Sequence, residues 1–159
     1  ANDLSFTTSG YKIEGQTLFL GGATAPIITN AVTAEISANL GGNTGLTKLG
    51  AGTLVLSGAN YQLGGNVIAG AAVNSNIVVN DGILRLTNSK GAGTGTLVVN
   101  GGYQRGRVEL SGGVTLTNAI TLQGRQGPTY SAITNNGGDN TLSGAINVVA
   151  NGARLNFNS

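Results

Sequence analysis

The sequence predicts an all-β chain wound into a solenoid, and three observations carry this prediction. Apolar residues recur at every second position, which is the period of a strand and not of a helix. Short strands alternate with turns rich in glycine and asparagine, which tolerate positive φ. The turn motifs recur at matched places, so that successive copies could stack. A sandwich or barrel would share the short strands, but a sandwich of this length normally buries an aromatic anchor and the chain has no Trp.

Composition supports one thin, aliphatic domain spanning residues 1–159, or one segment of a longer array. The chain has 28 glycines, 40% hydrophobic residues and only 4% aromatic residues. Charged residues make up 9%, against about 25% in an ordinary globular domain, so Asn, Thr, Ser and Gln must supply the polar surface. This composition favours a protein that works outside the cell. The start at Ala1 fits either a mature product or an excised piece.

The first elements read as strands. Residues 4–7 alternate apolar and polar side chains. Residues 31–40 place Val32, Ile36 and Leu40 at helical spacing, but the same residues also fit a strand, and their β-rich neighbours favour that interpretation.

Residues 45–65 form the best-preserved unit, with a glycine turn, the strand Thr53 to Leu56 and a second turn. Side chains alternate along a strand, so Leu54 and Leu56 should face the lumen of the solenoid. We expect the charged Lys48 to sit outside.

Residues 90–95 read Lys-Gly-Ala-Gly-Thr-Gly, which faintly resembles a phosphate-binding glycine loop. They lack the P-loop spacing, and Gly-Ala-Gly-Thr also occurs at residues 50–53, so we interpret them as a repeat turn. A Val-Val-Asn or Val-Val-Ala unit followed by a turn begins at Val78, Val98 and Val148.

The unit at residues 45–65 resembles the autotransporter-associated β-strand repeat, also called the passenger-associated transport repeat. Its pattern is close to G-L-T-K-x-G-x-G-T-L-x-L-S-G-x-N, and this chain matches it from Gly45 to Asn60, with departures at Leu49 and around Tyr61. The resemblance implies a right-handed parallel β-helix, secreted or displayed on the bacterial cell surface. At roughly 20 residues per repeat, the chain would make about seven rungs. The resemblance implies no fixed activity.

The residue types argue against most catalysis. The chain has no His and no Cys, which removes histidine bases, catalytic triads and structural zinc sites. We therefore predict no catalytic, cofactor-binding or metal-binding residues and no enzyme activity. A polysaccharide lyase or hydrolase using Asp81 with Arg85, or Arg107 with Glu109, stays a minor alternative, since Arg105, Arg107 and Glu109 should share one face of a strand. Turns at Asp81 and Asp139 could ligate Ca²⁺, but turn chemistry explains them better.

Partners follow from charge and from the ends of the chain. Net charge is +2 without a basic cluster, so we expect no nucleic acid partner, and no apolar run is long enough for membrane insertion. The terminal strands carry neither proline nor a capping helix, and open edges pair with other chains. We therefore predict head-to-tail self-association into filaments of a fibre, stalk or surface layer, through the edge residues Leu4, Phe6, Leu155 and Phe157. The alternative is an adhesin-type segment that binds glycans or other surface proteins.

Overall fold

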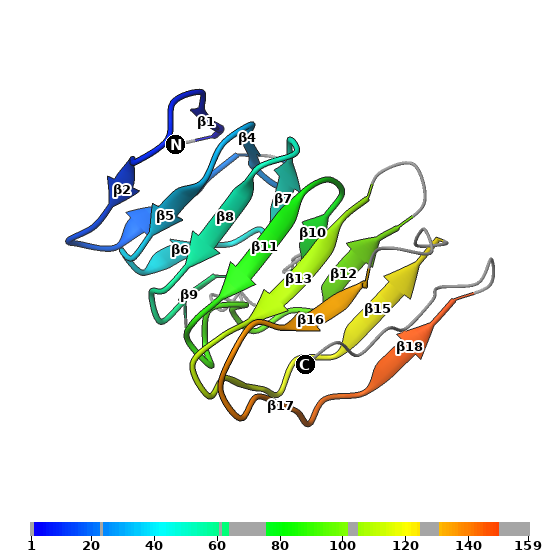
Figure 1. Cartoon of the computed structure of the whole chain (residues 1–159). Coiled ribbons are helices and arrows are strands. Elements are labelled where there is room, and N and C mark those ends of the chain that lie inside the picture. The colour runs from blue at the N-terminus through cyan, green and yellow to red at the C-terminus, as the bar shows by residue number, and fades with distance from the viewer. Residues whose placement is uncertain are drawn as a thin grey trace.

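The computed structural model describes residues 2–22, 24–60, 62–63, 76–101, 105–124 and 131–149. These residues form 18 short strands and no helix, so the predicted all-β class is confirmed. Figure 1 shows the strands stacked into a solenoid, with β5, β8, β11 and β13 side by side along one wall. In the described part of the chain, no helix is long and apolar enough to cross a membrane.

Every strand pairing among the described residues is parallel, as the predicted β-helix requires. Sheet A contains, in order, β1 (Leu4–Phe6), β4 (Ile27–Asn30), β7 (Leu46–Leu49), β10 (Ile77–Val79), β12 (Leu97–Asn100), β15 (Ile120–Gln123) and β18 (Ile146–Val148). Sheet B contains β2 (Lys12–Ile13), β5 (Ala34–Ile36), β8 (Thr53–Leu56), β11 (Ile83–Leu86), β13 (Arg107–Leu110) and β16 (Ile133–Asn135).

The third side of the solenoid is built from two shorter sheets. Sheet C contains β3 (Leu18–Phe19), β6 (Leu40–Gly42) and β9 (Gln62–Leu63). Sheet D contains β14 (Thr115–Leu116) and β17 (Thr141–Leu142). Each of these strands follows a strand of sheet B and precedes one of sheet A. Between β11 and β12, residues 87–96 are turn and irregular backbone, so the third side is interrupted there.

The rungs of the solenoid differ in length, so the expected number of about seven rungs is slightly too high. Ile77 pairs with Leu46 on the rung before it and with Leu97 on the rung after it. The stretch of chain from Leu46 to Ile77 is clearly longer than the stretch from Ile77 to Leu97. Because several rungs are longer than the expected repeat, the chain completes slightly fewer turns than a uniform repeat would give.

The lumen is filled by columns of aliphatic side chains from equal positions on successive rungs. Leu54 pairs in register with Ala34 and Leu84, and Leu56 pairs with Ile36 and Leu86. All of these side chains are buried, so the inward orientation predicted for Leu54 and Leu56 is confirmed. Fully burying one such leucine contributes about 1.5–3 kcal/mol, and the columns repeat this gain at each rung.

The repeated motifs coincide with structural register in two of three copies. Val78 and Val79 pair with Val98 and Val99, and the amide of Asn100 donates to Asn80 Oδ1 at 2.5 Å. The third copy is shifted by one position, because Val148 pairs with Leu122, which itself pairs with Val99. The strand interpretation of residues 31–40 is also correct, since they contain β5 and the start of β6.

Candidate functional site

Lys48 lies inside the solenoid, and the expectation that it sits outside is wrong. Its side chain is 0% exposed. It lies two positions after the buried Leu46 on β7, so both side chains point into the lumen. Its register partners, Ile28 and Val79, are buried aliphatic residues of the same column. The register of sheet A therefore fixes the direction of this side chain, regardless of its charge.

The Lys48 ammonium reaches from the lumen to a corner of the solenoid. Nζ donates hydrogen bonds to the carbonyl oxygens of Gly50 at 2.6 Å, Asp81 at 2.9 Å and Leu49 at 3.0 Å. Burial lowers the pKa of this lysine from 10.5 to about 8, and the Asp81 carboxylate opposes part of that shift. Lys48 thus ties two rungs together through backbone carbonyls.

Glycines allow these corners to stack. Gly50 has φ of +81°, and a Cβ at this position would overlap the carbonyl oxygen of Asn30. Gly82 in turn sits over the same corner, where its Cβ would overlap the carbonyl oxygen of Gly50. The corner equivalent to Gly50–Gly52 is therefore the one at Asp81–Gly82.

The Gly-Ala-Gly-Thr at residues 91–94 is a turn, but it does not occupy the corner equivalent to residues 50–53. Residues 50–52 connect sheet A to sheet B, whereas residues 91–94 lie on the path from sheet B back to sheet A. Strand β12 follows them. The two sequences are alike because both need tight turns, and they serve different sides of the solenoid.

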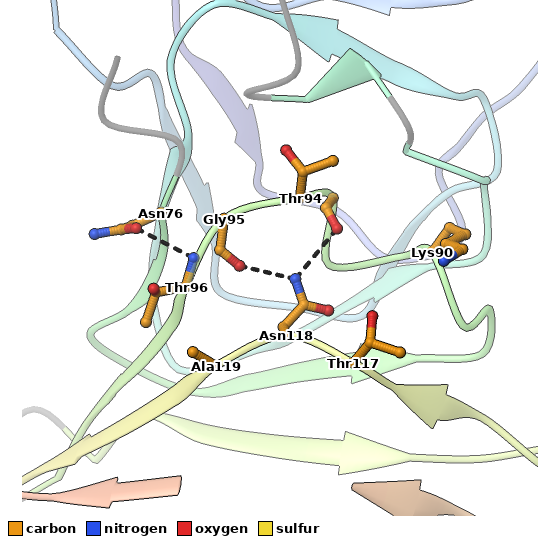
Figure 2. Close-up of a pocket in the computed structure, with 9 residues that line it drawn as sticks. Asn76, Lys90, Thr94, Gly95, Thr96, Thr117, Asn118 and Ala119 are labelled. Atoms are coloured by element: carbon orange, nitrogen blue, oxygen red, sulfur yellow. Dashed lines mark hydrogen bonds between the residues drawn. The ribbon is translucent and has the colours of Figure 1, made fainter. Parts of the chain in front are cut away.

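A polar groove of about 470 Å³ lies at the interruption of the third side. Figure 2 shows Lys90 and Asn76 on opposite sides of it. It is lined by Asn76, Lys90, Gly93, Thr94, Gly95, Thr96, Thr117, Asn118 and Ala119. The sequence pointed to residues 90–95 as a glycine loop, but it contains no signal that Thr117 and Asn118, one rung away, complete the lining.

Buried asparagine holds the groove in shape. Asn118 is 8% exposed, and its Nδ2 donates to Gly95 O at 2.8 Å and Gly93 O at 3.2 Å (Figure 2). On the other side, Asn76 Oδ1 accepts a hydrogen bond from Thr96 N at 3.2 Å. The irregular segment is therefore braced by the neighbouring rungs.

The ion pair in this region joins neither of the two pairs suggested for a polysaccharide lyase or hydrolase, which were Asp81 with Arg85 and Arg107 with Glu109. Arg85 and Glu109 occupy register partners on β11 and β13, and their side chains form an ion pair at 2.7 Å. Arg107 and Glu109 do share the outer face of β13, but Arg105 precedes the strand and has φ of +55°. Partly exposed pairs of this kind typically contribute less than about 1 kcal/mol.

The two suggested calcium turns do not gather acidic ligands in the described ranges. Asp81 accepts a hydrogen bond from the adjacent Gly82 N at 2.8 Å, which is ordinary turn chemistry. Within residues 2–149, apart from the undescribed gaps, no group of three or more Asp, Glu, His or Cys side chains is placed to hold a metal ion.

Of the residues predicted to mediate self-association, the structure describes only those near the N-terminus. Leu4 and Phe6 lie on β1, the terminal strand of sheet A, and Phe6 is buried in the core. Leu155 and Phe157 lie outside the described residues. At that end, the last described strand of sheet A is β18.

Comparison with known proteins identifies a relative in Brucella suis biovar 1 (strain 1330), named adhesin BmaC autotransporter. The two sequences are 37% identical over 112 residues, which is 69% of this chain and 3% of the relative. This chain therefore spans a small part of that protein's length. No protein-family model matches the chain, and no solved structure matches it. The relationship and the parallel solenoid together confirm that this chain resembles the β-helical repeat proteins associated with autotransporters.

Proposed function

We propose that this chain is a non-enzymatic, extracellular structural β-solenoid that extends a stalk or fibre by stacking head-to-tail. The observation that carries the proposal is the state of its end rungs. Parallel ladders propagate by adding one more strand to each sheet, and an end rung leaves those positions open. A contact between unlike ends is heterologous, so it repeats into a filament.

At the β18 end, lumen columns reach the surface. Ile146 and Val148 pair with Ile120 and Leu122, which are each 1% exposed. Ile146 and Val148 themselves are 38% and 48% exposed, and no described strand pairs with the other side of β18. These side chains have the size and position of core residues, so a further rung would bury them.

At the opposite end, β1, β2 and β3 each terminate their sheet and have a described partner on one side only. Tyr11 and Phe19, on this first rung, are exposed. Within the described residues, both ends thus combine strand edges that have one described partner with exposed apolar side chains. We propose a second copy of this chain as the occupant, with its first rung on the β18 end of the copy before it.

Electron microscopy and sedimentation velocity of the purified chain test the stacking. We expect filaments of constant width whose length grows with concentration. Ile146→Lys should abolish them, because stacking would bury an ammonium group over the aliphatic column that Ile120 and Leu97 fill. Ile27→Lys is the matched control, since Ile27 is 37% exposed but lies in the interior of sheet A. Short monodisperse particles of the unmodified chain at all concentrations would contradict the proposal and favour a longer polypeptide as the source of the next rung.

A second candidate function is adhesion through a lateral face, and the name of the Brucella relative favours it. In this case the solenoid would bind glycans or other surface proteins while it extends the stalk. A glycan array with folded chain tests this role, and a complete absence of hits would count against it. For the non-enzymatic assignment, a broad polysaccharide screen should show no turnover; turnover lost in Asp81→Ala or Glu109→Ala would reverse it.

A further inference from the structure

We infer that the polar groove on the third side binds a saccharide that carries a carboxylate, such as a uronic acid. This inference rests on the proposed adhesive role and adds the site and the ligand class. The groove volume of about 470 Å³ lies within the range of about 300–1,000 Å³ that small-molecule sites occupy.

The position of the groove makes polar groups accessible. Elsewhere on the third side, the strands within sheet C pair with one another, and so do the two strands of sheet D. Residues 93–96 lie at the interruption between these sheets and are not part of any strand. Thr117 is exposed beside this segment, so the lining offers a hydroxyl group that can donate and accept hydrogen bonds.

The groove is also preorganised, which limits the entropy lost when a ligand binds. Below it, Asn60 holds the turn through its Nδ2 bond to Gly91 O at 2.7 Å. Above it, Asn118 bonds to Gly93 and Gly95, as described. Within the turn, Gly93 N donates to Lys90 O at 3.0 Å, and Lys90 N donates to Asn88 Oδ1 at 2.9 Å. The backbone that presents Lys90 is therefore fixed.

The charge of the lining selects the ligand class. Lys90 is the one cation among the lining residues, and no carboxylate lines the groove in the described part of the chain. The ion pairs of the described residues join Lys12 to Glu14 and Arg85 to Glu109, so Lys90 takes part in neither. A single ammonium group matches a single carboxylate, and it gives the groove a preference for anions.

The remaining lining favours a sugar over other anions. The exposed Thr117 hydroxyl matches the hydroxyl groups of a pyranose ring. No aromatic side chain and, except for Ala119, no apolar side chain is among the described lining residues, so a nucleobase or an acyl chain would find no stacking or packing partner. The turn offers no helix N-terminus to bind a phosphate dianion, because β12 follows it.

The test is an NMR titration of the full chain with methyl β-glucuronide and with methyl β-glucoside, which lacks the carboxylate. We expect amide shifts concentrated at residues 90–96 and 117–119, and tighter binding of the glucuronide. Lys90→Gln should weaken glucuronide binding about tenfold and leave glucoside binding unchanged. Lys12→Gln is the matched control, because it removes the same charge on the first rung, and it should change neither.

Thr117→Val supplies a second test, since it replaces an exposed hydroxyl with a methyl group of similar shape and should weaken both sugars. Binding of the glucuronide that is unchanged in Lys90→Gln, or equal displacement by inorganic phosphate, would overturn the assignment of the groove. If glycan arrays show binding but the groove variants retain it, only this inference fails. If no saccharide binds anywhere, the glycan-binding form of the adhesive role fails with it.

Discussion

Lys48 places a charge in a column that is otherwise aliphatic. Its neighbours in the column are Ile28 and Val79, and the column continues through Val99 to Leu122. An ammonium group in such a place is costly unless it finds hydrogen-bond acceptors. Three corner carbonyls supply them, and among the described rungs only this one brings a lysine to them. If β7 paired with its neighbouring strands in a shifted register, the Lys48 ammonium would lose these acceptors. We therefore infer that Lys48 also favours the observed register of β7.

The lowered pKa of Lys48 predicts that stability rises with pH in the alkaline range. Below about pH 8 the lysine is charged in both folded and unfolded chains. Between about pH 8 and 10.5 the unfolded chain binds more protons, so its free energy rises relative to the folded state. The gain is on the order of 3 kcal/mol when complete.

Denaturant unfolding of the wild-type chain and of Lys48→Met, at several pH values across this alkaline range, measures the effect. The variant cannot titrate at position 48, so it corrects for tyrosines and other groups. The difference in free energy of unfolding should shift in favour of the wild type as pH rises. Two parallel curves over this range would refute the burial of a charged lysine.

The direction of Lys48 could have been predicted from its alternation with Leu46, but the strand β7 that contains both residues was not identified from the sequence. The residue type misled the prediction, since lysines are almost never fully buried unless paired. What the sequence could not show was the set of acceptors. Asp81 O comes from 33 residues further along the chain, and only the winding brings it to Nζ.

At the scale of single elements, the glycines of the turns differ in how strictly the structure requires them. Gly50 combines a left-handed φ with close stacking against the carbonyl of Asn30. Gly112 has a left-handed φ of +92° but open space around its missing Cβ. Gly21 has neither restriction. These three positions separate backbone strain from steric overlap.

Alanine substitutions at these glycines should therefore differ in a fixed order. Gly21→Ala should change the free energy of unfolding by less than about 0.5 kcal/mol. Gly112→Ala should cost about 1–2 kcal/mol from the left-handed conformation alone. Gly50→Ala should cost more than Gly112→Ala, because the overlap adds to the strain. Equal losses at Gly50 and Gly112, measured by chemical denaturation, would show that the corner relaxes without cost.

The positions of the strands were easier to predict from the sequence than the register in which the strands pair. Alternation identified β8. The Val-Val-Asn motif at Val78 and Val98 coincides with the register of β10 and β12, because identical side chains occupy equal positions and form the Asn80–Asn100 contact. The prediction failed where rungs differ in length. The Val-Val motif at Val148 predicts a register that is off by one position, since the hydrophobic column accepts Val148 as readily as Val149.

At the scale of the whole molecule, each rung contacts only the rungs before and after it, so stability should vary along the axis. Central strands such as β8 and β11 are paired on both sides, whereas β1 and β18 have one described partner. Hydrogen exchange at low protein concentration should show the strongest protection for amides of Leu54 and Leu84 and weaker protection at both ends. Uniform protection would indicate that the solenoid unfolds as one cooperative unit.

The unequal rungs have an evolutionary consequence. The path from sheet B to sheet A spans residues 37–45 between β5 and β7, and residues 57–76 between β8 and β10, which is more than twice as long. Sheets A and B stay in register on either side of both paths. Doubling the length of a loop typically costs only about 0.6 kcal/mol. Insertions and deletions can therefore accumulate on one side of this rod, where new recognition loops can arise and be exchanged without redesign of the scaffold.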